Sequence, residues 1–466
     1  MTDTSVFVEL PGGETVLAGW IHFQINPGEY KPTINFEYAQ DYLGAPGAYA
    51  FSPDLPLNAG YQSAPMQRET FMALADVQPD SWGRRLLQSE SRRAAREAGI
   101  RWEPPTGLDL LLAVPDITRQ GALRFKADPS GPFVSEVNTR VPSVVDLEDL
   151  VAAAERFERG DYDLDDTSIR QLVQVGTTQG GARPKAIVED DEGRLAIAKL
   201  PHPEDRWDVM RWEAVALQLA ADSGIETPPF KLHSLSDFRA VLTVTRFDRT
   251  PTGGRIGYLS AKGLMLADDG APVDYTLLAD HLTEISASPT HDAEQLFRRV
   301  ALSLLVSNVD DHMRNHGLLR GAAGWRISPV FDVNPFPMET GVDSTPVSPE
   351  DDPYSRDLRL LIENCGHFRL TTARAARIIR EVELASAEWA HVAGRFGVEH
   401  DSIARMARAF ENENRDRARA IADQLPGSAA DSDERTPAGS SSRWVPAHIR
   451  NGKPVKGYLR GTGQAR

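Results

Sequence analysis

Three polar side chains in one stretch of the chain have the types and spacing needed for metal-assisted phosphoryl transfer. Asp310 is followed five positions later by Asn315, and Asp332 comes directly after the apolar pair Val330-Phe331. In phosphoryl transfer, one carboxylate orients the attacking hydroxyl, while an amide oxygen and a second carboxylate hold Mg²⁺ against the ATP phosphates. The stretch therefore predicts a phosphotransferase that uses ATP and Mg²⁺.

The elements predicted around these residues would bring them to one place. A core-facing helix predicted over residues 293–306 ends just before Asp310 and would deliver its loop. A hairpin predicted over residues 317–328 separates this loop from Asp332. Upstream, the pattern predicts a helix at 207–223 and short strands at 169–175, 185–188, 195–199 and 240–245.

A glycine-containing loop and a strand-end lysine are candidates for contacts with phosphate. Glycine lets backbone N–H groups approach a phosphate closely, because no Cβ intervenes. Lys199 ends an apolar strand and could pair with the ATP phosphates and with Glu213 on the next helix. Taken alone, the loop could be an ordinary turn and Lys199 could simply reach solvent. The loop consists of Gly180, Gly181, Ala182, Arg183, Pro184 and Lys185.

Two other metal sites are weaker interpretations. His312 and His316 have the i, i+4 spacing of zinc ligands, but no glutamate separates them as in zinc proteases. Aspartate and asparagine suit Mg²⁺ better, so His312 is interpreted as a structural or nucleotide-contacting residue. The acidic run 161–166 lacks the glycine and distal glutamate of a calcium loop, which favours a solvated loop.

Composition limits the class of protein. The 466 residues are 41% hydrophobic, which allows two or three domains. The net charge of −16 argues against broad binding of nucleic-acid backbones. Cys365 is the single cysteine, so a disulfide framework and a multi-thiolate zinc site are excluded. With no signal peptide and no long apolar run in the sequence, we expect a cytoplasmic protein that does not enter a membrane.

We expect an α+β architecture of four parts. Residues 1–115 contain a predicted hairpin and an Arg-rich helix at 80–98, and form an N-terminal subdomain. Residues 116–247 would form a β-rich lobe that holds the glycine loop, and 248–425 a mainly helical lobe that holds Asp310. Residues 426–466 have the composition of a flexible linker and a basic tail.

The motifs resemble those of HipA-type toxin kinases, in order and in spacing. Residues 79–85 and 121–125 are similar to the N-terminal subdomain of that family, so the resemblance covers about residues 5–424. The matching motifs further along are Gly180-Gly181-Ala182-Arg183-Pro184-Lys185-Ala186, Ala198-Lys199-Leu200-Pro201, Arg246-Phe247-Asp248-Arg249, Asn308-Val309-Asp310-Asp311-His312-Met313-Arg314-Asn315 and Pro329-Val330-Phe331-Asp332.

The resemblance implies a two-lobed Ser/Thr protein kinase of a bacterial toxin–antitoxin module. Asp310 would be the catalytic aspartate, with Asn315 and Asp332 as ligands of Mg²⁺. Lys199 and the 180–185 loop would hold the phosphates of ATP. Thr245, Arg246 and Phe247 would receive the adenine through their backbone, although the family has a glutamate where this chain has Thr245.

The resemblance also implies partners and regulation. Family members are neutralised by a HipB-like helix-turn-helix antitoxin, so contact with DNA would be indirect, and their substrates include aminoacyl-tRNA synthetases. The family's autophosphorylated serine aligns with Thr178, next to Thr177. Two alternatives stay open, namely a weakly catalytic co-repressor of a DNA-binding antitoxin and a kinase of a small metabolite. The sequence names neither the substrate nor the oligomeric state.

Overall fold

The computed structural model describes most of the chain. The described residues are 2–24, 33–65, 68–134, 141–160, 167–176, 181–236, 239–268, 270–337 and 344–423, with 442–445, 448–450, 453–455 and 458–461 near the C-terminus. The chain divides into two compact units, Met1–Leu425 and Pro426–Arg466. The candidate site residues lie in the first unit.

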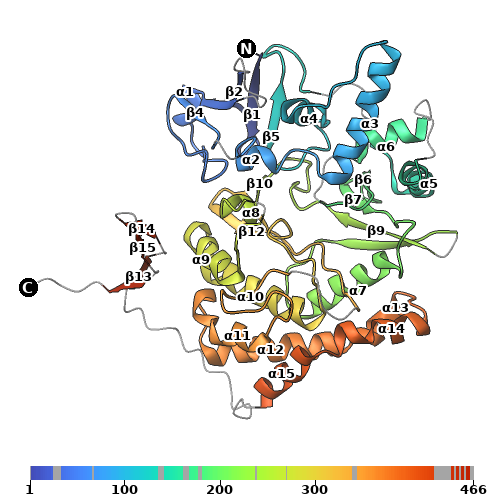
Figure 1. Ribbon diagram of the computed structural model, residues 1–466, viewed down its shortest axis with the longest axis vertical. Helices are drawn as coiled ribbons and strands as arrows, with labels where there is room; N and C mark the ends of the chain where they lie inside the picture. The colour runs from blue at the N-terminus through green and yellow to red at the C-terminus, as the bar shows by residue number, and fades with distance from the viewer. Residues whose placement is uncertain are drawn as a thin grey trace, which may run out of the picture. The chain divides into compact units, whose positions relative to one another are not determined.

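An antiparallel five-stranded sheet with the order β4-β3-β2-β1-β5 forms the N-terminal region, at the top of Figure 1. Its fifth strand, β5, pairs with β1 but lies beyond residue 115, where the N-terminal subdomain was predicted to end. Alternate residues of β1 and β2 face a core that includes Val6, Val8 and Ile21. The elements are β1 (Thr2–Glu9), β2 (Thr15–Gln24), β3 (Thr33–Tyr38), α1 (Gln40–Leu43), β4 (Tyr61–Ser63), α2 (Met72–Ala75), α4 (Gly107–Ala113) and β5 (Leu123–Lys126).

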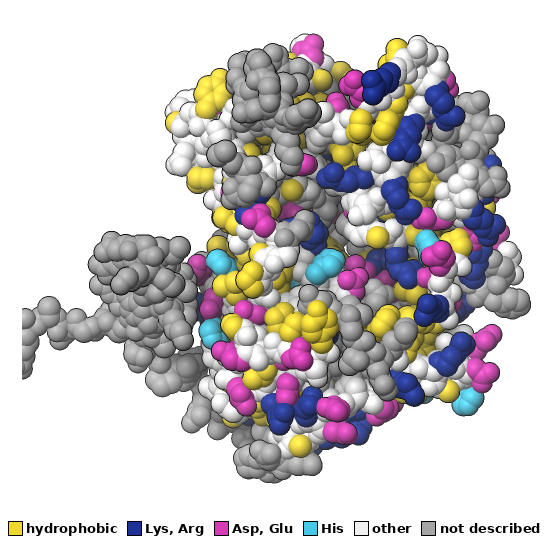
Figure 2. All heavy atoms as spheres, viewed as in Figure 1, with side chains coloured by type: hydrophobic (Ala, Val, Ile, Leu, Met, Phe, Trp, Pro, Cys, Tyr) yellow, Lys and Arg dark blue, Asp and Glu magenta, His cyan; other side chains and the backbone are white. Residues whose placement is uncertain are grey.

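Helix α3 (Ser81–Glu97) connects this region to the next layer. Asp80 caps the helix by accepting a hydrogen bond from the Gly83 N–H at 2.6 Å. Trp82 and Leu86 on its inner face pack in a core with α5 (Leu147–Glu158), which follows the 3₁₀ turn Val144–Asp146, and with α6 (Thr167–Val175). Lys and Arg side chains gather at the upper right of Figure 2, over the outer face of α3.

A four-stranded antiparallel sheet with the order β6-β7-β9-β8 forms the middle of the unit. Helix α7 packs against β8 and β9. The apolar strand β9, with five of its six residues buried, fits a central position, while β8 forms one edge. The elements are β6 (Lys185–Glu189), β7 (Leu195–Lys199), α7 (Val209–Asp222), β8 (Phe230–Ser234) and β9 (Ala240–Thr245).

Helices dominate from residue 261 onwards, below the sheets in Figure 1. The long helix α10 is almost wholly buried, because it contacts α9, α11, α12 and α15. A small sheet of order β10-β11-β12 pairs the strand just before α8 with a hairpin that follows α10. The elements are β10 (Gly257–Ser260), α8 (Ala261–Leu264), α9 (Tyr275–Ile285), α10 (Pro289–Leu305), β11 (Gly317–Gly321), β12 (Gly324–Ile327), α11 (Leu358–Glu363), the 3₁₀ turn Cys365–Phe368, α12 (Thr372–Ala387), α13 (Trp389–Arg395), α14 (His400–Phe410) and α15 (Glu413–Asp423).

Two predicted elements differ from the structure. Residues 169–175, predicted as a strand, belong to helix α6, because the apolar residues at 169, 172, 173 and 175 also fit a helical face. The C-terminal segment, predicted to be a flexible tail, contains four short strands paired as two hairpin-like sheets. These are β13 (Ser442–Val445) with β16 (Tyr458–Gly461), and β14 (His448–Arg450) with β15 (Lys453–Val455).

The predicted elements around the candidate site are confirmed to within a few residues at their ends. They are the strands β6, β7 and β9, the helices α7 and α10, and the β11–β12 hairpin. None of the helices in the described part of the chain is long and apolar enough to cross a bilayer.

Candidate active site

Lys199 joins two carboxylates that are far apart in the sequence. Its Nζ donates to Glu213 Oε1 at 2.5 Å and to Asp332 Oδ1 at 2.8 Å. The lysine ends β7, the glutamate lies one turn into α7, and the aspartate follows β12. Only 2% of the Glu213 side chain is exposed, compared with 32% for Asp332. A strand end, a helix and a loop therefore converge on one cation.

Charge pairing decides the ionisation of this cluster. Burial alone would lower the pKa of Lys199, but the two carboxylates outweigh burial and raise it. Burial raises the pKa of Glu213, and Lys199 opposes that effect only in part. The pKa of Asp332 is lowered, because the attraction of Lys199 exceeds the effect of its burial. At neutral pH the cluster thus has a charged lysine and an ionised Asp332.

Asp332 is held in a strained backbone conformation. Its φ of 59° lies in the left-handed region, which costs a residue with a Cβ about 1–2 kcal/mol. Asn334 stabilises this turn from both sides, because its N–H donates to Asn308 Oδ1 at 3.1 Å and its Nδ2 donates to Asp332 Oδ1 at 3.2 Å. Sequence reasoning missed Asn334, although an asparagine two residues after Asp332 was a local signal.

The loop after α10 presents Asp310 to solvent. The Nδ2 of Asn315 donates to the backbone carbonyl of Asp310 at 2.9 Å and closes the loop. Partial desolvation raises the pKa of the Asp310 carboxyl. His312 lowers this pKa, while the negative charges of Asp332 and Asp311 raise it further. Asp310 therefore lies beside Asn315 and within electrostatic reach of Asp332.

A buried network beneath the loop has no counterpart in the sequence prediction. Asp311 accepts a hydrogen bond from Tyr275 Oη at 2.6 Å, and His316 Nε2 lies 3.0 Å from its other oxygen. These partners hold the pKa of Asp311 well below its usual range despite burial. Arg356 donates to the Asn308 carbonyl at 2.9 Å. Since Tyr275 is 36 residues from Asp311, no local pattern could have identified the pair.

The glycine loop has a different environment from the one predicted. It follows helix α6, where a strand at 169–175 was predicted, and its described part begins at Gly181. Lys185 is buried, and its Nζ donates to Asp80 Oδ2 at 2.7 Å. Arg183 forms a bidentate pair with Asp205 at 2.7 and 3.1 Å. Gly180, Thr177 and Thr178 lie outside the described residues.

The segment predicted to receive adenine is partly committed to other contacts. The Arg246 N–H donates to the Leu195 carbonyl at 2.9 Å, which removes that donor from any ligand. Its guanidinium is buried against Asp248. The ring of Phe247 lies 5.5 Å from the ring of Phe331, the residue that precedes Asp332. Thr245 Oγ1 donates to Asp190 at 3.3 Å.

The oxygen atoms around Asp332 fit a hard cation. Asp332 and Asn315 supply carboxylate and amide oxygens, which Mg²⁺ prefers. The buried Oδ1 of Asn334 has no hydrogen-bond partner among the described residues, so this oxygen is free to accept a hydrogen bond or to face a cation. Among the described residues there is no group of three or more His, Cys, Asp or Glu side chains that could hold a metal ion. His312 is exposed, whereas His316 is buried.

The chain is similar to known proteins in one domain and in its fold. Residues 177–389 match the HipA-like C-terminal domain family. Among solved structures, the chain is similar to that of the complex of Shewanella oneidensis MR-1 HipA with HipB and operator DNA, at 16% identity and a TM-score of 0.61, covering 88% of this chain and 95% of that one. This likeness establishes an α+β fold of the HipA type. No curated protein matches the chain.

A Helicobacter pylori proinflammatory kinase, CtkA, is also similar over 53% of this chain and 94% of that one, at 13% identity. Its TM-score of 0.37 is too low to support an argument about this chain.

Proposed function

Because the chain has a HipA-like C-terminal domain and the fold of HipA, we propose that it is an ATP- and Mg²⁺-dependent Ser/Thr protein kinase that acts as a toxin. The observation that carries this proposal is the pairing of Lys199 with both Glu213 and Asp332. Kinases require a strand lysine paired with a helix glutamate, and a metal-binding aspartate, all in place at once.

Each residue has a role that its position supports. Asp310 is exposed, and its raised pKa suits a group that accepts the proton of an attacking hydroxyl. Asn315 fixes the Asp310 loop through the 2.9 Å hydrogen bond. Lys199 orients the ATP phosphates, and Asp332 with Asn315 would hold Mg²⁺. When bound, Mg²⁺ neutralises the charge that develops on the transferred phosphoryl group.

The proposed partner is a HipB-like helix-turn-helix antitoxin. This chain would then contact DNA only indirectly, through that partner. The similar HipA structure contains HipB and operator DNA, and the net charge of −16 disfavours direct binding of this chain to the DNA backbone. The proposed substrate is a translation component such as an aminoacyl-tRNA synthetase, and Thr177 or Thr178 is the proposed site of autophosphorylation.

The proposal is tested by incubating the purified protein with Mg²⁺ and γ-labelled ATP, alone and with a bacterial lysate. We expect label on the protein and on one lysate protein. Asp310→Asn and Asp332→Asn should each abolish the label, while Asp149→Asn, an exposed change on α5, should retain it. Full labelling by a folded Asp310→Asn variant would contradict the assignment, and so would a wild type that binds ATP but transfers no label.

A further inference from the structure

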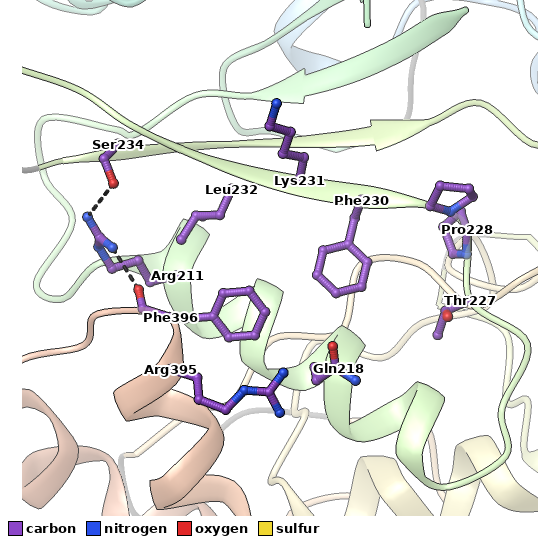
Figure 3. Close-up of a pocket in the computed structure, with 11 residues that line it drawn as sticks. Arg211, Gln218, Thr227, Pro228, Phe230, Lys231, Leu232, Ser234, Arg395 and Phe396 are labelled. Carbon is purple, nitrogen blue, oxygen red and sulfur yellow. Dashed lines mark hydrogen bonds between the residues drawn. The ribbon is translucent and has the colours of Figure 1, made fainter. Parts of the chain in front are cut away.

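A pocket of about 670 Å³ lies beside the edge strand β8, and Figure 3 shows its walls. It is formed by β8, by α7 and by the end of α13. None of the lining residues takes part in the cluster around Lys199 or in the Asp310 loop. The lining includes Arg211, Phe230, Lys231, Leu232, Arg395 and Phe396.

The backbone of β8 offers hydrogen-bonding groups along this pocket. The strand pairs with β9 on one side, and no described strand pairs with its other edge. The Thr245 N–H donates to the Pro229 carbonyl, and the Leu235 N–H to the Arg239 carbonyl, so odd-numbered residues of β8 face β9. Because ladder bonds skip alternate residues, the backbone groups of Phe230, Leu232 and Ser234 point to the open edge.

The side chains on the pocket side of β8 are apolar. Phe230 and Leu232 are half-buried and point into the pocket in Figure 3, while Lys231 points to the other side of the strand. The ring of Phe396 lies 6.3 Å from that of Phe230. An added strand would therefore place every second side chain on an apolar floor.

The charge of the pocket is opposite to that of the protein as a whole. Its lining contains three cations and no carboxylate, in a chain of net charge −16. Arg211 pairs with Asp208 and donates to the Phe396 carbonyl, and Lys231 pairs with Asp191. Arg395 is exposed and has no ion-pair or hydrogen-bond partner among the described residues, so it can receive a carboxylate from outside.

We propose that this pocket is a docking site for an extended acidic segment of a partner protein. The segment adds to the open edge of β8 as a further strand, with backbone hydrogen bonds to Phe230, Leu232 and Ser234. Its alternate apolar side chains lie on Phe230, Leu232 and Phe396, and a carboxylate pairs with Arg395. Docking at β8 does not require phosphotransfer, so it stands or falls separately from the proposed kinase activity.

The test is a binding titration in the absence of ATP. The probe is a fluorescein-labelled peptide in which valine or leucine alternates with glutamate, and binding to the full chain is followed by fluorescence anisotropy. We expect saturable binding that Arg395→Glu weakens by about tenfold, because repulsion replaces attraction. Arg380→Glu, an exposed change on α12 outside the pocket, should bind the probe as the wild type does.

Two modified probes test the strand geometry on the wild-type protein. Methylation of alternate backbone nitrogens removes the donors that face β8 and should abolish binding, and lysine in place of glutamate should do the same. No saturable binding of the acidic probe would overturn the proposal. Equal binding of the methylated and unmethylated probes would also overturn it, because the contact would not be strand addition.

Discussion

Replacement of Lys199 by methionine would leave two carboxylates facing each other without a cation. Glu213 and Asp332 each accept a hydrogen bond from the same Nζ, so their oxygens lie close together. Methionine keeps most of the side-chain volume, so the change removes the charge with little loss of packing. We expect the variant to fold but to be markedly less stable at neutral pH.

The magnitude follows from the burial of the two acids. Removing one partner of a buried ion pair costs about 3–5 kcal/mol. The Glu213 side chain is almost completely buried, but Asp332 is one-third exposed and partly screened, which favours the lower end, about 3 kcal/mol. For a chain of this size such a loss lowers the unfolding temperature by roughly 5 °C.

The loss should depend on pH in a defined direction. Without Lys199, the folded-state pKa of Glu213 rises further above its unfolded value, because burial and Asp332 both disfavour its charge. The carboxyl then gains a proton in the folded state as the pH falls, so the variant recovers stability relative to the wild type. The difference between the two proteins should be larger at pH 7.5 than at pH 5.

Thermal unfolding of both proteins at the two pH values measures this effect. Lys231→Met is the matched control, because Lys231 and Asp191 form a solvent-exposed pair whose loss should change the stability little. An unfolding temperature of Lys199→Met equal to that of the wild type at pH 7.5 would refute the reasoning. A loss that does not shrink at pH 5 would refute the role assigned to the two carboxylates.

Three further predictions concern the buried acids. Asp76 accepts two hydrogen bonds from Ser260, and burial raises its pKa to about 6. The contribution of Asp76 to stability is complete below about pH 4. It is lost as the pH rises through 6, by about 3 kcal/mol. Thermal unfolding of Asp76→Asn should therefore show a weaker decline across that window, and curves parallel to the wild type would contradict this. Asp248→Asn should cost about 3–5 kcal/mol in urea unfolding at pH 7, since it leaves two buried arginines without their carboxylate; a loss below 1 kcal/mol would be inconsistent. Tyr275→Phe should cost about 1–3 kcal/mol, because buried Asp311 loses a donor, and should speed hydrogen exchange in the Asp310 loop; unchanged exchange would show that the network does not hold the loop.

Local signals in the sequence predicted the part of the site that depends on local structure. Helix α10 repeats apolar residues along one face, β9 is almost wholly apolar, and the β11–β12 hairpin has glycines at its turn. Each of these patterns lies within one element. Of these elements, α10 ends just before Asp310, and only the β11–β12 hairpin separates Asp310 from Asp332. Local signals were therefore enough to predict how the chain carries the two aspartates.

The errors and omissions arose where the outcome depends on distant contacts. Residues 169–175 contain β-branched residues that suit a strand, but packing of Leu172, Val173 and Val175 against α3, α5 and the middle sheet selects a helix. Strand β8 was missed because it follows Pro228-Pro229 and alternates only weakly. The pairing of Lys185 with Asp80, 105 residues away, leaves no pattern in either segment.

That distant pairing changes how the N-terminal region relates to the site. Asp80 both caps α3 and binds the buried Lys185, and Trp82 Nε1 donates to the Lys185 carbonyl at 3.1 Å. Burial raises the pKa of Asp80 and lowers that of Lys185, so each charge depends on the other to remain in place. The end of the predicted phosphate loop is therefore positioned by the start of α3. A lysine without this carboxylate would either lose its charge or leave the core, and in both cases the loop would lose its anchor. The start of α3 thus holds the loop that precedes β6 in place through Asp80 and Trp82.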